Sequence, residues 1–244
     1  MLVELLRGEF SGREVVFYLI IMLIALSLSF SIHEFMHAFV ATWLGDDVAK
    51  NQGRVTLNPL AHIDPVGTLC ILIAGFGWGK PVQYNPNNLT RFKSKKWMCI
   101  MVHLAGVTGN FILALICAII STILYYTVNQ DSPVVIAIMA ALTYTELFCL
   151  GLLAFNLIPI PPLDGFHVLE ELLPYRVKYK DGFRKFVHYG PMVLMGLILL
   201  GSLTGIDVFG IIMGIIELPF DIIIMLVRVL ISAVFFGAVP PPTL

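Results

Sequence analysis

Residues 15–44 read VVFYLIIMLIALSLSFSIHEFMHAFVATWL, an apolar run that acquires His33, Glu34 and His37 only in its second half. The run is longer than the roughly 20 apolar residues that a helix needs to cross a bilayer, and it contains neither proline nor glycine. We therefore expect a transmembrane helix that carries its polar residues toward one end. At about 1.5 Å per residue, His33 lies roughly 27 Å along a helix that begins at Val15, near one surface of a hydrocarbon core about 30 Å thick.

The composition of the whole chain also indicates a membrane protein. Of its 244 residues, 58% are hydrophobic and only 13% are charged, and the mean hydropathy is +0.90. Basic residues gather in two short segments between apolar runs, residues 80–96 and 176–185, with five Lys or Arg in each. This pattern is typical of cytoplasmic loops, so we expect both segments in the cytoplasm and the N-terminus outside. Segments this short do not indicate a nucleic-acid partner.

Four further apolar segments are candidates for membrane crossings. They cover residues 97–128, 134–157, 187–203 and 206–240. The last contains Glu217, Asp221 and Arg228, so it could also be a shorter span or lie partly in the interface. The sequence therefore predicts an all-α polytopic membrane protein with about five transmembrane helices, in a range of roughly four to six.

The chain between the first two crossings has a different character. Residues 66–78 are apolar but too short to cross, which is typical of a re-entrant segment. Residues 82–84 could form an edge strand before the loop residues 85–88. The predicted fold therefore includes a short re-entrant or β-strand region here. We expect residues 1–244 to form one membrane-embedded domain, with a core over about 15–170 and C-terminal membrane helices over about 187–238.

The motif H-E-x-x-H at residues 33–37 predicts a metal site. The spacing of four places both imidazoles on one helix face, one turn apart, where they can share a tetrahedral zinc ion. Glu34 projects beside them and can act as a general acid and base. Ionisable groups inside a membrane helix are costly unless they are paired, which strengthens a functional interpretation.

A catalytic zinc ion needs a third protein ligand if it is to keep one position open for water. Residues 156–165 read NLIPIPPLDG and follow the crossing that ends near residue 157, on the same side of the membrane as His33. Asp164, beside the glycine of this segment, is the best candidate. His167, three residues later, is the rival ligand.

Two motifs together resemble the site-2 protease family of intramembrane zinc metalloproteases. They are H-E-x-x-H at 33–37 and N-x-x-P-x-x-P-L-D-G at 156–165. Further stretches agree with this family, namely LNPLAHIDP at 57–65, GFGWGKPV at 75–82, NP at 85–86, and AG at 105–106 with Asn110. The resemblance covers about residues 20–170 and is closest to the short subclass without a PDZ domain.

The resemblance implies roles for individual residues. It assigns His33, His37 and Asp164 as ligands of one Zn²⁺ ion per chain, and Glu34 as the general acid/base. It also assigns Asn156 as a polar group near the scissile carbonyl or the substrate backbone.

Two positions qualify this assignment. Asn156, at a helix end, could equally satisfy carbonyl groups freed by Pro159. Val107 stands where the family typically has proline after Ala-Gly, which concerns helix entry or packing rather than the ligands.

The resemblance further implies regulated intramembrane proteolysis. The partners would be the lipid bilayer and a membrane-protein substrate with a transmembrane helix, with no nucleic acid, and the sequence leaves the oligomeric state open. The protein would be a multi-pass protein of a bacterial cell membrane with its active site toward the cytoplasm. An unwound substrate could pair as an added strand with residues 82–84.

Two other classes of function remain open. A membrane metal-ion transporter also carries His, Glu and Asp inside its helices. It predicts polar residues along the whole depth of a span, whereas we expect them here at one level. A catalytically inactive family scaffold is the other alternative, and the intact metal motif disfavours it.

Overall fold

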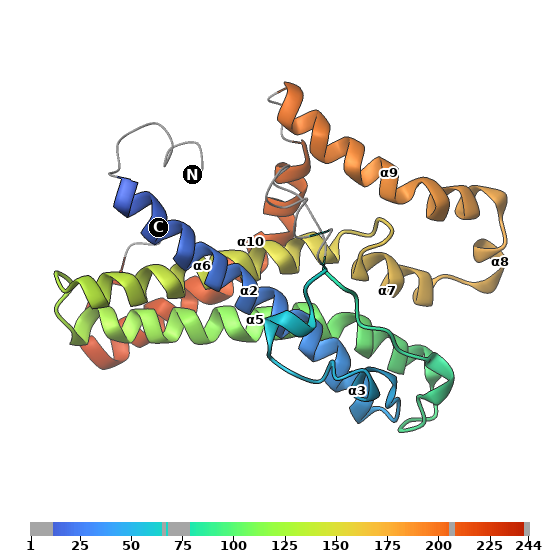
Figure 1. Ribbon diagram of the computed structural model, residues 1–244, viewed down its shortest axis with the longest axis horizontal. Coiled ribbons are helices and arrows are strands. Elements are labelled where there is room, and N and C mark those ends of the chain that lie inside the picture. The colour runs from blue at the N-terminus through green and yellow to red at the C-terminus, as the bar shows by residue number, and fades with distance from the viewer. Residues whose placement is uncertain (1–11, 65–66, 68–78, 205–207, 242–244) are drawn as a thin grey trace.

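The structure, a computed structural model, describes residues 12–64, 67, 79–204 and 208–241. Within these ranges it is helical and has no strand (Figure 1). The long helices are α2 (Gly12–Trp43), α5 (Lys95–Thr127), α6 (Pro133–Leu157), α9 (Asp181–Thr204) and α10 (Val208–Ile231). The short elements are α3 (Val48–Asn51), η1 (Pro59–Ala61), η2 (Pro86–Asn88), α7 (Asp164–Leu172), α8 (Tyr175–Lys178) and a π-helical turn, η3 (Ser232–Phe236).

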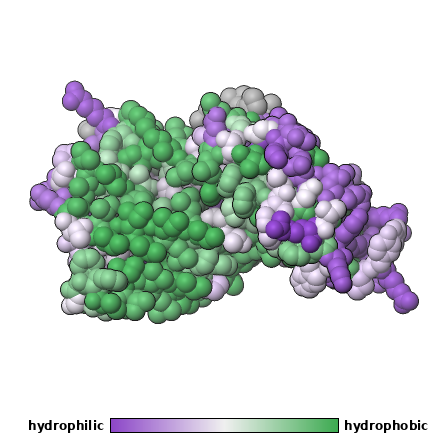
Figure 2. Space-filling model, turned by 90° about the horizontal axis from the view of Figure 1, so that it is seen from below, coloured by the Kyte–Doolittle hydropathy of each residue, from purple (hydrophilic) through white to green (hydrophobic). Residues whose placement is uncertain are grey.

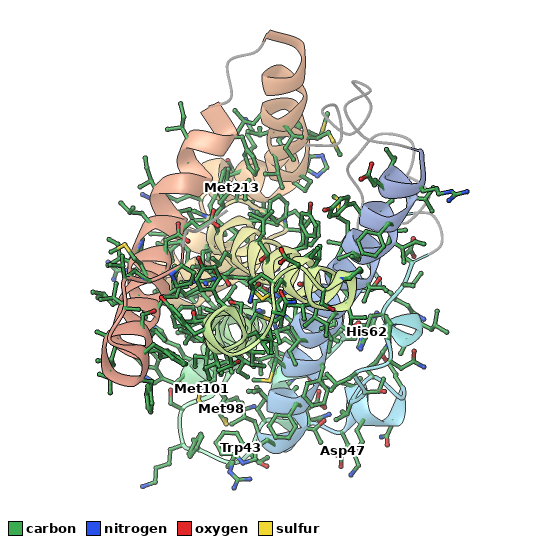
Figure 3. The ribbon with its side chains drawn as sticks, turned by 90° about the vertical axis from the view of Figure 1, so that its left-hand side faces the viewer. Trp43, Asp47, His62, Met98, Met101 and Met213 are labelled. Carbon is green, nitrogen blue, oxygen red and sulfur yellow. The ribbon has the colours of Figure 1, made fainter. Side chains whose placement is uncertain are left out.

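The bundle consists of α2, α5 and α6 packed against one another, with α10 against α5 and α6. Viewed from the end at which α2 begins, α5 and α6 lie between α2 and α10 (Figure 3). Small residues allow close approach: Ala25, Ala38 and Ala41 of α2 are buried, and a Cβ on Gly109 of α5 would collide with the side chain of Met36. Close packing of this kind holds helices together in lipid, where water does not drive their association.

Four helices among the described residues are long and apolar enough to cross a membrane. They are α2, α5, α6 and the continuous helix Phe209–Phe236. This number lies within the predicted range, and the segment 206–240, which was ambiguous in the sequence, supplies a span of full length.

The crossing predicted at residues 187–203 is not among these four. The corresponding helix, α9, begins at Asp181 and includes the basic residues Arg184 and Lys185, and its main contacts are with α10 and α8. With four crossings, η3 ends on the side where α2 begins, as Figure 1 shows.

Local sequence signals explain where the helices begin and end. α2 ends at Trp43, two residues before Gly45, whose φ of 115° is open to glycine but costly for other residues. Ser94 caps α5, since its Oγ accepts the N–H of Trp97 at 3.5 Å, and Pro133 occupies the first turn of α6. Pro159 follows the end of α6, because proline cannot continue a helix. The chain then turns into α7, which begins at Asp164.

The molecule has an apolar body and a polar end. On the face that Figure 2 shows, apolar side chains cover the bundle, and most hydrophilic side chains gather at the end opposite the start of α2. Buried Asp46 holds the loops at this end together, because it accepts hydrogen bonds from the N–H of Asn85 at 2.8 Å and from Nδ2 of Asn88 at 2.7 Å.

The region between the first two crossings differs from the prediction. Residues 79–85 form irregular chain without a strand ladder in the described part of the protein, so the expected edge strand at 82–84 is wrong. The backbone of this segment is held at single points instead, for example by Lys80 N–H, which donates to the carbonyl of His62 at 2.8 Å. The predicted re-entrant segment 66–78, apart from Gly67, lies outside the described residues.

Candidate metal centre

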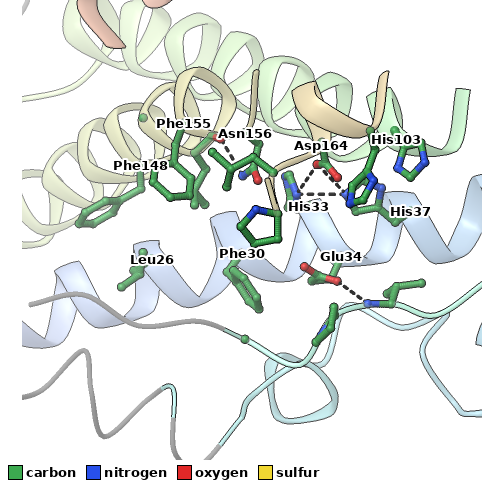
Figure 4. A pocket seen from close by; sticks show the side chains of 18 of the residues that line it. Leu26, Phe30, His33, Glu34, His37, His103, Phe148, Phe155, Asn156 and Asp164 are labelled. Atoms are coloured by element: carbon green, nitrogen blue, oxygen red, sulfur yellow. Dashed lines mark hydrogen bonds and ion pairs between the residues drawn. The ribbon is translucent and has the colours of Figure 1, made fainter. Parts of the chain in front are cut away.

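The two histidines of the H-E-x-x-H motif face the same side of α2. Their Nε2 atoms are 3.1 Å apart, and both residues are buried. Glu34 leaves α2 on a different side from the two histidines, and its Oε2 accepts the N–H of Val82 at 3.1 Å (Figure 4). The helical spacing therefore has the predicted effect, and the irregular segment 79–85 fixes the position of the glutamate.

Asp164 reaches the two histidines from the first turn of α7. Its Oδ2 lies 3.2 Å from Nε2 of His33 and 3.2 Å from Nε2 of His37. The neighbouring glycine permits this approach, because a Cβ on Gly165 would collide with the backbone carbonyl of Leu157 at the end of α6. Within the described ranges, this is the one group of three or more His, Cys, Asp or Glu residues whose ligand atoms all lie within 4.8 Å of one another.

These three atoms fit a bound metal ion. In a tetrahedral zinc site with ligand distances of about 2.0–2.1 Å, neighbouring ligand atoms lie roughly 3.3 Å apart, close to the observed edges. Asp164 Oδ2 is buried without a hydrogen-bond partner. His37 Nδ1 lies 2.7 Å from the carbonyl of Val102, so this nitrogen is the donor, and in the neutral imidazole Nε2 presents a lone pair. Acceptor atoms this close repel one another unless a cation lies among them, and two imidazoles with a carboxylate suit zinc.

The carboxylate of Asp164 is ionised in this setting. Burial raises the pKa of Asp164, but positive charge on the imidazoles of His37 and His33 lowers it by more, so that it lies well below its usual range, and a cation bound between neutral imidazoles would act in the same direction. A metal ligand must be deprotonated, and Asp164 meets this requirement.

Gly106 of α5 lies against the Nε2 edges of the two imidazoles. A Cβ at this position would collide with His37 Nε2 and would lie 2.6 Å from Cε1 and 2.7 Å from Nε2 of His33. The space that a side chain would fill is therefore taken by the two imidazoles. The sequence indicated Gly106 only as part of a family motif.

A large cavity adjoins the three residues. Its volume is about 1530 Å³, above the roughly 300–1,000 Å³ of ordinary ligand pockets, which leaves room for a polymer segment. Apolar side chains of α2 and α6 line one part of it, among them Leu26, Phe30, Phe148 and Phe155 (Figure 4). His33, Glu34, His37 and Asp164 line another part.

Asn156 also lines this cavity. Its Nδ2 donates to the carbonyl of Leu152, one turn earlier in α6, at 2.9 Å. The sequence had offered Pro159 as the reason for such a bond, but proline at 159 affects the carbonyl of residue 155, which accepts the N–H of Ile158. The amide of Asn156 is thus held at the cavity wall by its own helix.

His167, the rival ligand, lies apart from the three-residue group. Its ring stacks on that of His103 with centroids 4.9 Å apart, and its Nδ1 lies 3.6 Å from Oε2 of Glu170. Tyr84 joins this second polar group, because its hydroxyl lies 2.9 Å from Nε2 of His103. Burial raises the pKa of the Tyr84 hydroxyl, which therefore stays protonated and can donate. The geometry favours Asp164 over His167 as the third ligand.

A second buried polar cluster lies further from the polar end, and the sequence reasoning missed it. Arg228 of α10 contacts Oε2 of Glu146 in α6 at 2.6 Å and donates to Oγ of Ser121 in α5 at 3.3 Å. Glu146 precedes Asn156 by ten residues, or about 15 Å of helix. The expectation that ionisable groups occupy one level is therefore wrong. An Arg and a Glu in separate predicted spans were a usable signal, since such charges are expected to pair.

Comparison with known proteins identifies relatives over most of this region. The model of peptidase family M50 matches residues 21–200. YwhC of Bacillus subtilis, a protein named as a zinc metalloprotease, is 41% identical over 164 residues, which are 67% of this chain and 72% of YwhC.

Two mycobacterial proteins named as the zinc metalloprotease Rip2 are more distant. The Rip2 of Mycolicibacterium smegmatis is 30% identical over 148 residues, which are 59% of this chain and 53% of that protein. The Rip2 of Mycobacterium tuberculosis is 31% identical over 149 residues, with the same coverage. No solved structure matches the chain.

Proposed function

The chain belongs to peptidase family M50 and is a zinc metalloprotease, and on that premise we propose that it hydrolyses peptide bonds in or near the transmembrane helices of membrane-protein substrates. One observation carries the proposal. The group His33, His37 and Asp164 borders a cavity of about 1530 Å³ whose walls include helices long and apolar enough to span a bilayer. Apolar helical walls of this kind suit a transmembrane segment better than a soluble polypeptide.

In this proposal His33, His37 and Asp164 hold the zinc ion. Zinc bound there would polarise the scissile carbonyl and lower the pKa of water. Glu34 acts as general base and then as general acid, taking a proton at its carboxylate and delivering it to the leaving amine. The hydrogen bond from Val82 N–H holds one carboxylate oxygen, Oε2, and so orients Glu34 toward the cavity that it lines.

The substrate backbone needs partners once its helix has unwound. We assign one to Asn156, whose amide lies at the cavity wall. Residues 82–84 supply others, since all three line the cavity and irregular chain there can pair with an extended peptide. Backbone pairing of this kind demands little of the substrate sequence, which suits a protease that acts in regulated intramembrane proteolysis.

The proposed topology places the active site toward the cytoplasm of a bacterial cell. The two basic segments, residues 80–96 and 176–185, lie on the same side of the four spans, and the positive-inside rule assigns that side to the cytoplasm. The group His33, His37 and Asp164, which we call the metal group, lies toward this polar end. Water can therefore reach it from the cytoplasm without crossing the bundle.

The test is cleavage of a single-span substrate reconstituted with the protein in liposomes. Glu34→Gln keeps the shape of the side chain but removes the base, so cleavage should fall by about 10²- to 10⁴-fold while bound zinc stays equal to wild type. Equal cleavage by both proteins would refute the assigned mechanism. Zinc uptake into the same liposomes that survives Glu34→Gln, without cleavage by either protein, would favour a transporter.

A further inference from the structure

One face of α5 contacts both imidazoles of the metal centre. Val102, Gly106 and Asn110 follow one another at a spacing of four, so they lie on one side of the helix, and all three are buried. The carbonyl of Val102 faces Nδ1 of His37 at 2.7 Å, and the Asn110 amide faces Nδ1 of His33 at 3.3 Å. Gly106 lies between them and leaves room for both imidazoles. The face thus provides one polar partner for each histidine.

The two partners, the Val102 carbonyl and the Asn110 amide, differ in whether they always act as hydrogen-bond acceptors. If Nε2 of each imidazole binds zinc, then Nδ1 of each neutral imidazole carries a proton and needs an acceptor. The Val102 carbonyl is always an acceptor, so His37 is held in the required tautomer. A side-chain amide offers either an oxygen or an NH₂ group, and only the oxygen can accept the proton of His33.

The orientation of the Asn110 amide follows from this requirement. The structure has Nδ2 toward His33 Nδ1, while Oδ1 is buried without a hydrogen-bond partner. The oxygen and nitrogen of an amide are assigned from their hydrogen bonds, because their shapes are nearly identical. A half-turn of the amide places Oδ1 against the N–H of His33, which pairs these two atoms and removes a contact between two donors, and Nδ2 takes the former position of Oδ1.

We propose that Asn110 is a positioning residue of the metal centre: its amide oxygen accepts the Nδ1 proton of His33 and so directs Nε2 of His33 toward the zinc ion. This inference rests on the proposed ligand set and extends it. A buried Asn among apolar helices costs free energy unless it is hydrogen-bonded, and His33 is the side-chain partner described for Asn110. Partners of this kind typically contribute about 10- to 100-fold to metal affinity.

The test compares zinc affinity, measured by competition with a chromogenic chelator in detergent micelles. Asn110→Leu keeps a similar volume but has no acceptor, so its zinc affinity should fall by about 10- to 100-fold. Asn110→Asp retains an acceptor and should bind zinc at least as tightly as wild type. Thr122→Val is the matched control, because it removes a buried hydrogen bond in α5, from Oγ1 to the Ala118 carbonyl at 2.7 Å, and should leave zinc affinity unchanged.

Wild-type zinc affinity in Asn110→Leu would overturn the inference, and so would Asn110→Asp binding as weakly as Asn110→Leu, since packing alone would then explain the residue. If wild type binds zinc and cleaves its substrate in either of these cases, the proposed function stands. If wild type binds no zinc, both fail.

A second measurement does not depend on whether a variant folds. Nitrogen NMR of zinc-loaded wild type with ¹⁵N-labelled histidine should give two metal-bound imidazoles that are protonated at Nδ1. An His33 bound to zinc through Nδ1 would contradict the inference.

Discussion

Two buried polar clusters lie among the helices, and they differ in charge balance. The metal group brings together three acceptor atoms, two imidazole nitrogens and a carboxylate oxygen, with edges of 3.1–3.2 Å. The other cluster, Glu146 with Arg228 and Ser121, which we name the clasp, joins a cation directly to an anion. The metal group therefore needs an added cation, whereas the clasp is already neutral.

The two clusters also differ in whether a cavity lies beside them. Gly106 leaves space beside the Nε2 atoms of His33 and His37, and a cavity adjoins these residues. None of the three clasp residues lines that cavity. Burial of charge in a membrane helix thus has two explanations here. Unbalanced acceptors beside a cavity indicate a binding site, while a balanced pair between helices indicates a structural contact.

The clasp should give the largest effect on stability. Arg228→Leu leaves Glu146 buried without its partner, which should lower the free energy of unfolding by about 3–5 kcal/mol. Unfolding by SDS in mixed micelles measures this change. Bound zinc per folded chain should equal that of wild type, because the clasp and the metal group are separate.

The paired control is the double variant with Glu146→Leu and Arg228→Leu. Two apolar residues replace the ion pair, so most of the lost stability should return. Loss of zinc from the folded Arg228→Leu protein would erase the distinction between the clusters. A double variant as unstable as the single one would contradict the ion-pair explanation.

Gly106→Ala should give a smaller change in free energy, at the metal group. The added Cβ displaces both imidazoles, and a displacement of about 1 Å costs roughly 100-fold in rate, or about 2.7 kcal/mol. Gly214→Ala in α10 is the matched control, because a Cβ there meets no atom within 4 Å. The cleavage rates of the two variants, measured side by side, test this prediction. Equal rates would show that the space at Gly106 beside the imidazoles is unimportant.

The sequence predicted the first three spans to within a few residues. Expected ranges of 15–44, 97–128 and 134–157 correspond to α2 (Gly12–Trp43), α5 (Lys95–Thr127) and α6 (Pro133–Leu157). Long apolar runs and their turn residues are local signals, so one sequence suffices. The crossing at 187–203 stays a prediction, because part of this segment lies outside the residues whose side chains the structure describes.

The candidate site was predictable only in part, for a related reason. His33, Glu34 and His37 follow from helix geometry, and Asp164 follows from its motif. The contributions of Val102, Gly106 and Asn110 depend on which face of α5 meets α2. Apolar residues surround a buried membrane helix on all sides, so periodicity does not identify that face. The partnership of Glu146 with Arg228 depends on packing in the same way.

Zinc K-edge X-ray absorption of the purified protein tests the metal group most directly. We predict one zinc ion per chain bound by two imidazole nitrogens and a carboxylate oxygen at about 2.0–2.2 Å, with the same spectrum in His167→Ala. Absence of zinc from wild type, or a third imidazole that disappears in His167→Ala, would contradict it.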